Sequence, residues 1–525
     1  MGRAAEVILE MRLKGIKLWS ENGRLHYKTS GGDITRADIT KLAEAKAEIM
    51  SILDKPSPES NELQLVRRDP TEKVLLTFSQ QAWWNSLGLE KHPSNRSVFT
   101  AVRLLGPLNV HYLKQAFAEI VQHHVVLRTV IVTMNGIRQQ CISEDSQYIL
   151  EVVNLPTIPK AEREATAERM ILELITEPVD VSVGPLFAAK LIAISSEDHV
   201  LAVALDHLIS DAFSMGILQR DIWTLYSQLQ QGIPFHLPRQ PVQFADYAVW
   251  QHKSHHSWTK KHHAYWADRL SGARQVSLFE RDTVVEGAKP SLASLSIDFG
   301  KELSEGLRNL GRHERTTLAM TVLCAYSALA FCWCDITDLV VPFVTMGRSH
   351  LELERVVGFF GYQLFLRFDL HESDNFLDLL RRISTEYASA YEHQDSGRVS
   401  AQMPRPEFAS NFGFNWYPSE YHLHSTALTA FIDNAEVPGI GEHLKLQPFT
   451  FQNALRNVFR GDAEAIREGG LQLTSSEDGI SGALWYRTDC VTPASISRFR
   501  GNLILFAERL LREPHKRVKE CAVSS

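Results

Sequence analysis

Apolar and polar positions follow two different periods along the chain. Residues 98–106 and 199–207 are short apolar runs rich in β-branched side chains, a composition that predicts buried strands. Residues 110–124 and 496–511 carry apolar side chains at helical spacing, which predicts helices. The mixture predicts an α/β fold over residues 74–515. This length exceeds what one hydrophobic core usually fills, so we expect two lobes.

The first 56 residues show a separate, shorter pattern. The runs 16–19 and 24–27 alternate and flank Asn22-Gly23, and this dipeptide is a strong hairpin signal because both residues tolerate positive φ. Apolar residues at helical spacing precede and follow the two runs. The pattern predicts a small α+β domain with a β-hairpin over residues 1–56.

The predicted hairpin carries three basic residues, Lys17, Arg24 and Lys28. One interpretation is an exposed strand edge that pairs with an acidic partner peptide, and the other is an extension that only stabilises the rest of the chain. Residues 57–73 contain prolines and mixed charges without an apolar period, so we interpret them as a linker.

Composition narrows the class of protein. Hydrophobic residues make up 44% and charged residues 22% of the chain, as in ordinary soluble domains, and the formal net charge of −7 argues against a general nucleic-acid surface. No apolar run approaches the ~20 residues that span a bilayer, and the N-terminus lacks a secretory signal pattern. We therefore expect a cytoplasmic protein without a membrane partner. The six cysteines show no repeated spacing, which predicts reduced thiols and no metal site.

Candidate chemistry lies in residues 205–214, where an apolar run ends in a polar turn. His207 stands at the end of the run and Asp211 follows four residues later. A histidine can transfer a proton because its ordinary pKa is about 6.5, and a nearby acid can hold the loop or the ring in place. Histidines near strand ends are often structural, so this pattern by itself leaves both roles open.

The surrounding residues resemble the H-H-x-x-x-D-G signature of nonribosomal peptide synthetase condensation domains. His207 matches the second histidine and Asp211 the aspartate, whereas Asp206 and Ala212 replace the first histidine and the glycine. Other segments resemble further motifs of this family, in the family's order: LTFSQQAWW (76–84), HHVVLRT (123–129), FADYAVWQ (244–251), GRS (347–349), VGFFGYQLFLR (357–367) and EHQD (392–395). The resemblance spans nearly the whole chain after the linker.

This resemblance implies two chloramphenicol-acetyltransferase-like lobes in a V arrangement, here residues 74–260 and 261–515, with a tail at 516–525. It implies an acyltransferase whose donor is a thioester on the phosphopantetheine of a partner carrier protein, and no cofactor bound by this chain. The nucleophile is an amine or a hydroxyl, so the product is an amide or an ester. The acceptor is either carrier-bound or a free small molecule, and we favour a free acceptor and chain release.

The family resemblance also assigns roles at the site. His207 is the catalytic residue, which either accepts the proton of the nucleophile or orients the nucleophile and stabilises charge. The structural residues of the active site expected from this resemblance are Asp206, Asp211, Arg348, Arg367 and Ser214. We expect Asp211 to fix the loop through an ion pair with Arg348, in preference to Arg367, and Ser214 to shape the loop.

Three positions depart from the family pattern. Asp206 replaces a histidine, and Tyr362 and Gln363 stand where asparagine and threonine are usual, which makes the last two candidates for contact with the acceptor or the channel. Asp206 also creates a D-x-x-x-x-D-x-x-S spacing that resembles heterocyclization domains, so a heterocyclization domain is one alternative. A condensation-like domain that only recruits partners is the other.

The front of the chain resembles the tubulysin-type N-terminal docking domain of these synthetases. The matching text is ILEMRLKGIKLW (8–19), GRLHY (23–27) and KAEIMSIL (46–53). The resemblance implies binding to a short acidic linear motif at the C-terminus of a carrier protein, and it favours the docking interpretation of the hairpin. No adenylation or carrier motif follows residue 515, so we expect the donor to arrive on another protein.

Overall fold

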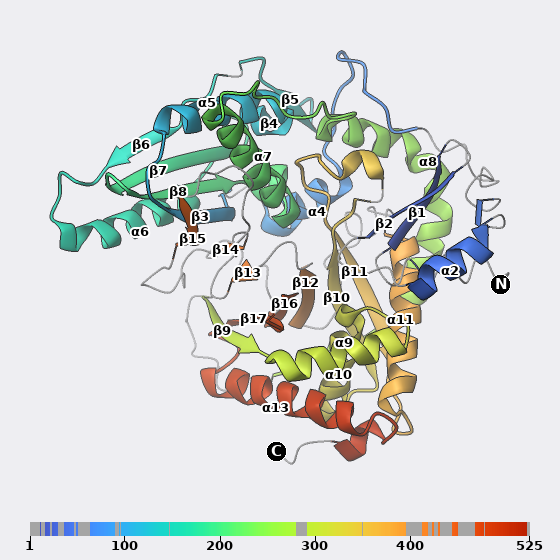
Figure 1. The fold of residues 1–525 in the computed structure, drawn as a ribbon. Helices are drawn as coiled ribbons and strands as arrows, with labels where there is room; N and C mark the ends of the chain where they lie inside the picture. Colours follow the sequence, from blue (N-terminus) through green and yellow to red (C-terminus); the bar gives the residue numbers. More distant parts are fainter. Residues whose placement is uncertain are drawn as a thin grey trace.

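The computed structural model consists of a small N-terminal unit and two larger α/β lobes (Figure 1). The Asn22-Gly23 turn, the residues before the hairpin except Met11, and residues 522–525 lie outside its described part. The structure describes residues 11, 16–21, 24–29, 36–46, 49–50, 64–89, 94, 96–145, 147–279, 291–348, 350–394, 412–417, 423–424, 429–430, 444–449, 468–476 and 478–521.

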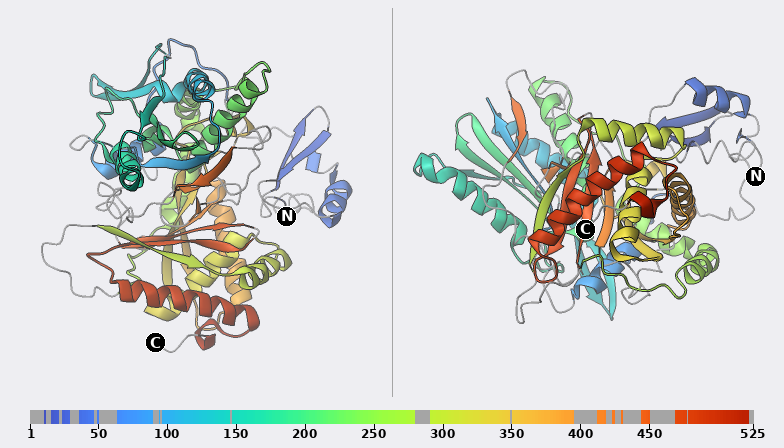
Figure 2. Two further views of the ribbon diagram at one scale, coloured as in Figure 1. Left: turned by 60° about the vertical axis from the view of Figure 1, so that its left-hand side comes forward. Right: turned by 90° about the horizontal axis from the view of Figure 1, so that it is seen from below.

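The N-terminal unit contains the predicted hairpin. Strands β1 (Ile16–Glu21) and β2 (Arg24–Thr29) are antiparallel, and helix α2 (Arg36–Glu44) follows them. A small apolar core joins helix and hairpin, made by Met11, Leu18, Leu42, Ala45 and Ile49. The unit lies outside both lobes (Figure 2). Within the part of the chain that the structure describes, neither lobe sheet pairs with a strand of the hairpin.

The first lobe is built on a five-stranded sheet of order β15-β3-β8-β7-β6. Helices α5 and α7 share a hydrophobic cluster with one face of the sheet, and α6 packs on the other face. The elements are β3 (Val98–Leu105), α5 (Val110–His123), β4 (Thr129–Met134), β5 (Ile137–Ile142), β6 (Glu151–Asn154), α6 (Lys160–Thr176), β7 (Phe187–Ser195), β8 (Asp198–Leu205), α7 (Ala212–Gln230) and β15 (Lys445–Pro448).

The second lobe is built on a six-stranded sheet of order β11-β10-β12-β16-β17-β9. Among the described residues, one face carries four helices. The other face is turned toward the first lobe, where Trp485 of β17 packs against the α6 side of the first sheet. The elements are β9 (Leu292–Asp298), α9 (Lys301–His313), α10 (Leu318–Cys334), β10 (Asp338–Thr345), β11 (Tyr362–Asp369), α11 (Phe376–Glu392), β12 (Phe412–Tyr417), β16 (Gly469–Ser475), β17 (Ile480–Arg487) and α13 (Pro493–Arg512).

Short elements complete the described chain: α4 (Phe78–Leu87), η1 (Val125–Arg128), η2 (His207–Ile209), η3 (Leu351–Leu353), β13 (Leu423–His424), β14 (Thr429–Ala430) and η5 (Val518–Cys521). Among the described residues, no single helix has the length and apolar composition of a membrane span; only the bent pair α9 and α10 meets that test together.

The two lobes exchange segments, so they are not consecutive stretches of sequence. Helix α8 (Phe244–Arg269) runs through the predicted boundary at residues 260 and 261 without interruption. Strand β15 comes from the C-terminal half of the chain but pairs with β3 of the first lobe. The predicted division at residue 260 therefore needs correction, because a later strand completes the first sheet.

Residues 64–73 are anchored on the first lobe and are not a free linker. Leu65 is buried, and the Arg67 side chain donates to the backbone carbonyls of Gln240 and Pro241 at 2.7 and 2.9 Å. The linker prediction for residues 57–73 is therefore wrong for residues 64–73. Few apolar side chains anchor these residues, so their sequence shows no hydrophobic period. Residues 57–63 lie outside the described residues.

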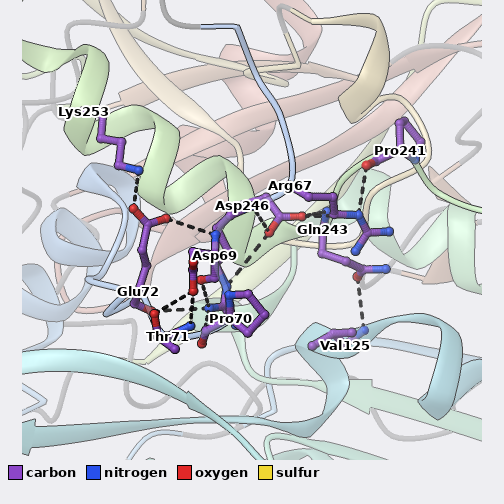
Figure 3. Close-up of polar contacts among 11 residues, drawn as sticks. Arg67, Asp69, Pro70, Thr71, Glu72, Val125, Pro241, Gln243, Asp246 and Lys253 are labelled. Carbon is purple, nitrogen blue, oxygen red and sulfur yellow. Dashed lines mark hydrogen bonds and ion pairs between the residues drawn. The ribbon is translucent and has the colours of Figure 1, made fainter.

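Asp246, in the first turn of α8, is the centre of this anchorage (Figure 3). Its carboxylate accepts from the backbone amides of Gln243 at 2.7 Å and Arg68 at 3.1 Å, and it lies within 4 Å of the guanidinium groups of Arg67 and Arg68. One carboxylate thus caps α8 and holds the strap formed by residues 64–73.

Replacement of Asp246 by alanine is expected to lower the free energy of unfolding by about 1–3 kcal/mol, because two amides lose their acceptor and α8 loses its cap. Urea denaturation measures this loss. Glu72→Ala is the control: it removes a partly exposed ion pair with Lys253, so its expected loss is below about 1 kcal/mol. Equal losses in the two variants would contradict the central role of Asp246.

Candidate active site

Two capping carboxylates shape the segment between β8 and α7. Asp206 accepts from the backbone amide of Leu208 at 2.8 Å and begins η2. Asp211 accepts from the amide of Ser214 at 2.8 Å and begins α7. Capping side chains of this kind satisfy amides that a helix start leaves without partners. His207, the first residue of η2, is therefore held between two fixed helix starts.

The ion pair predicted between Asp211 and Arg348 is present. It is bidentate, with Nη1–Oδ2 and Nη2–Oδ1 distances of 2.9 and 3.1 Å, and the two side chains are only 12% and 4% exposed. The amide of Phe360 donates to the same carboxylate at 3.1 Å. Burial alone would raise the pKa of Asp211, but Arg348 and the bonds from Ser214 outweigh burial and hold this pKa below its ordinary value.

Ser214 ties the same loop to the chain segment before β11. Its hydroxyl lies 2.8 Å from Asp211 Oδ1 and from the carbonyl of Gly358, and it accepts from Arg348 Nη2 and the Gly358 amide at 3.0 Å. A Cβ on Gly358 would lie 2.2 Å from the ring of Phe244, so this close approach requires glycine. A serine engaged on every side shapes the loop, and the carboxylate beside it, Asp211, is already paired with Arg348.

The imidazole of His207 lies between two aromatic rings. Its centroid is 4.6 Å from the ring of Trp83 on α4 and 4.5 Å from the ring of Phe359. Burial lowers the pKa of His207, while its own carbonyl, Asp211 and the carbonyl of Ser210 oppose this fall. The neutral ring is therefore favoured at neutral pH.

Tyr362 is buried rather than open to a substrate. Its hydroxyl lies 2.6 Å from that of Tyr247 on α8 and accepts from Gln251, so it joins β11 of the second lobe to the helix that links the lobes. Gln363 is exposed. It pairs with Val344, so it lies on the other face of the second sheet from Phe343, whose ring contacts Tyr387 of α11. Of the two channel candidates, only Gln363 is exposed.

Arg367 does not lie with Asp211. Its guanidinium makes a bidentate pair with Asp338 at 2.8 Å for both bonds, and it donates to the carbonyls of Arg269 and Ser271. In the antiparallel register, Arg367 is opposite Val340, whereas the site end of the strand pair is Tyr362 opposite Thr345. The expectation that Arg367 supports the active site is therefore wrong in this structure.

Several residues that hold the site were not predicted. Gln80, on α4, is fully buried and donates from Nε2 to the carbonyl of Leu208 at 2.7 Å. Trp83 and Phe359 enclose His207, whereas the neighbouring Trp84 is buried with Arg138 above its ring. The repeated aromatic at 83–84 was the available signal, but sequence alone does not tell which ring faces the site.

The basic residues predicted to dock a partner lie on both strands of the hairpin. Lys17 and Lys28 are opposite each other across the hairpin, and Arg24 is opposite Glu21; the side chains of the three basic residues lie outside the described part. The six cysteines are free thiols. Within the described ranges, no group of three or more His, Cys, Asp or Glu side chains is arranged to hold a metal ion.

Comparisons with known proteins agree on the class of both parts of the chain. A family model described as "Condensation domain" matches residues 71–400, and one described as "TubC N-terminal docking domain" matches residues 5–54. One of the linear gramicidin synthase proteins of Brevibacillus parabrevis is 30% identical over 359 residues, which are 66% of this chain and 7% of that protein. The chain thus spans a small part of this curated relative.

Solved structures share the fold. The X-domain from teicoplanin biosynthesis has a TM-score of 0.70 and 22% identity, over 88% of this chain and all of that one, and it has also been solved in complex with OxyB. The first condensation domain of the calcium-dependent antibiotic synthetase, in complex with a substrate analogue, has a TM-score of 0.66 and 15% identity, over 87% of this chain and all of that one. These likenesses confirm the predicted two-lobed α/β fold.

Loss of the Arg348 guanidinium should be strongly destabilising, because it leaves the buried Asp211 carboxylate without its cation. For Arg348→Met, a loss of about 3–5 kcal/mol in the free energy of unfolding is expected from urea denaturation. Arg367→Met is the matched control. Its expected loss is smaller, because the carboxylate that it leaves unpaired, Asp338, is 30% exposed and can be solvated by water. A larger loss in the control would refute this ranking.

The stabilisation that depends on ionised Asp211 should vanish in acid. A folded-state pKa below the ordinary aspartate value of about 3.9 gives full stabilisation above that value, which is lost as pH falls through the folded pKa. The difference in unfolding free energy between wild type and Asp211→Asn should therefore stay constant from pH 8 to 5 and shrink below about pH 4. A difference that grows in acid would contradict the assignment.

Proposed function

Because the chain belongs to the condensation domain family of nonribosomal peptide synthetases, with a docking domain of the TubC type before it, we propose that it transfers an acyl chain from a carrier-protein thioester to an amine or hydroxyl. The donor is held on the phosphopantetheine of a separate carrier. The observation that carries this proposal is His207, held at the start of η2 beside the buried Asp211–Arg348 pair.

The reaction needs no covalent enzyme intermediate, since the thioester is already activated. The nucleophile attacks the thioester carbonyl carbon, a C–N or C–O bond forms, the C–S bond breaks, and the carrier thiol leaves with a proton. A neutral His207 can accept the nucleophile's proton, or it can accept a hydrogen bond that orients the nucleophile. The lowered pKa of His207 supports a ring that is ready to accept at neutral pH.

The N-terminal unit would bring the donor to the site. Its hairpin edge would pair with a short acidic segment at the C-terminus of the carrier, with Lys17, Arg24 and Lys28 attracting the acidic residues. Docking raises the effective concentration of the thioester near His207. We favour a free small-molecule acceptor, with release of the chain as an amide or ester.

A recruiting domain without catalysis is the second candidate, favoured by the fold likeness to an X-domain that has been solved with OxyB. Heterocyclization has less support. It would need Asp206 to act on the substrate, but Asp206 is fully buried and its carboxylate caps the amide of Leu208.

The test follows a carrier protein that bears an acidic C-terminal tail and a model acyl-phosphopantetheine, by intact-mass spectrometry, with a pool of amines and hydroxy acids. Wild type should remove the acyl group and form a matching amide or ester. His207→Ala should slow this by about 10²–10⁴-fold, the usual contribution of a general acid or base. His236→Ala, which removes an exposed histidine, is the control and should match wild type.

Docking is tested separately in the same assay. Reversing the charge of Lys17, Arg24 and Lys28 to glutamate should raise KM for the tailed carrier by about tenfold or more without changing kcat. A tailless carrier should show no such difference. Binding of the carrier without turnover by wild type would favour the recruiting domain, and full activity of His207→Ala would remove His207 from the proposed mechanism.

A further inference from the structure

Three rings meet at the start of η2. The imidazole of His207 contacts Trp83 and Phe359, with centroid distances of 4.6 and 4.5 Å and interplanar angles of 39° and 59°, and the two aromatic rings contact each other at 6.2 Å and 84°. Phe359 is buried and Trp83 partly buried in the apolar core of the first lobe. We name Trp83 and Phe359 the aromatic clamp.

Hydrogen bonds join the three chain segments that carry Trp83, His207 and Phe359. Helix α4 carries Trp83, and its Gln80 donates to the carbonyl of Leu208, one residue after the histidine. Ser79 of the same helix donates to the carbonyl of Gly361 at 2.9 Å, two residues after Phe359. The amide of Phe360 donates to Asp211. The backbone segments that carry the three rings are therefore bonded to one another, and the bond from the Phe360 amide ends on the Asp211–Arg348 pair.

The two ring nitrogens of His207 have different surroundings. Nδ1 of His207 is buried and has no hydrogen bond of ordinary geometry among the described residues. The backbone carbonyls of His207 and Ser210 only partly oppose the fall of the His207 pKa that burial causes. A polar atom enclosed by aromatic side chains without a partner is costly, and the cost is greater still when the ring is charged. The neutral imidazole fits this place with its lone pair or proton on Nδ1 shielded, and Nε2 is left for chemistry.

The charged and titratable groups around the ring do not compensate for this burial. On the histidine's own loop, Asp206 is used by the Leu208 amide and Asp211 by Arg348. Tyr417, from β12 of the second lobe, is neutral at physiological pH, because burial and the charge of Asp211 raise its pKa to about 12. Helix α4 packs on the ring through Trp83, and the segment before β11 through Phe359, so the contacts from these two sides are apolar.

We propose that Trp83 and Phe359 are positioning residues, which fix the orientation of the His207 ring, keep water from its Nδ1 side and so present neutral Nε2 to the nucleophile. This inference rests on the proposed function for its purpose, but the clamp itself is a property of the resting protein. It assigns the aromatic residue at position 83 to the site and separates it from its neighbour Trp84, which belongs to the core.

The direct test is the titration of His207 in the full-length protein, followed by NMR of ¹³C-labelled histidine and identified by the signal that His207→Ala loses. In wild type the midpoint should lie below the ordinary value of about 6.5. Trp83→Leu opens one side of the ring, so the midpoint should move to higher pH. Trp83→Phe keeps an aromatic face and should stay near wild type.

Two further variants keep this test decisive. Phe359→Leu opens the other side of the ring and should also raise the midpoint, which covers the case that Trp83→Leu does not fold. Trp333→Leu removes a partly buried tryptophan from the second lobe, where it packs on Phe499, and should leave the midpoint unchanged. The inference is overturned when the variants that fold at positions 83 and 359 keep the wild-type midpoint.

Acyl transfer then separates the clamp from the proposed function. At pH 6 a histidine with the ordinary pKa of about 6.5 is roughly three-quarters protonated, so for Trp83→Leu the ratio of kcat/KM at pH 6 to that at pH 8 should fall relative to wild type, by at most about fourfold. A shifted NMR midpoint without acyl transfer by any variant would support the clamp and refute the function. Acyl transfer by wild type with an unshifted midpoint in the variants would support the function and refute the clamp.

Discussion

The buried ion pair between Asp211 and Arg348 is the constraint on which the site depends. Desolvating two charges is costly, and a buried pair is retained only where its geometry is good and the remaining donors and acceptors are satisfied. Here the pair is bidentate, and further bonds come from Ser214, Phe360 and the carbonyl of Val356. Nε of Arg348 is buried and is the guanidinium donor that has no hydrogen-bond partner among the described residues. The guanidinium also lies 4.2 and 4.4 Å from the ring centroids of Phe213 and Phe360.

This pair joins two parts of the chain that are distant in sequence. Asp211 begins α7 of the first lobe, and Arg348 follows β10 of the second. Gly347 makes the approach possible: its φ is +63°, and a Cβ there would lie 1.8 Å from the carbonyl oxygen of Phe360. Since Phe359 lies beside Phe360, the ion pair also determines where one ring of the aromatic clamp meets His207.

Local patterns predicted the regular elements well. The apolar run at 98–106 is β3, and the helical stripe at 110–124 is α5, each within one residue of the observed end. The Asp211–Arg348 pair was also predictable, because both residues fall in motifs of the family. These features depend on side-chain period or on short signatures, which a single sequence displays directly.

What the sequence did not predict depends on contacts between distant segments. Strand β15, at residues 445–448, pairs with β3, which is more than 300 residues earlier in the chain. A strand of four residues is too short for its sequence to show which strand it pairs with. The strap at 64–73 is held mainly by arginines on backbone carbonyls and on Asp246, so it has few apolar positions to show a period. Arg367 was misplaced for the same reason, since a motif does not show which acid an arginine meets.

Asp206 shows how a departure from a family motif can be explained by backbone chemistry. An aspartate that caps the amide of Leu208 satisfies a buried donor at the start of η2 and needs no contact with a substrate. Its carbonyl accepts from the hydroxyl of Ser210 at 3.0 Å, and its amide donates to the carbonyl of Leu186. The residue is committed to the loop on each of these three sides. The change from histidine to aspartate therefore leaves the chemistry of this segment to one imidazole, that of His207, whose protonation is governed by the rings packed on it.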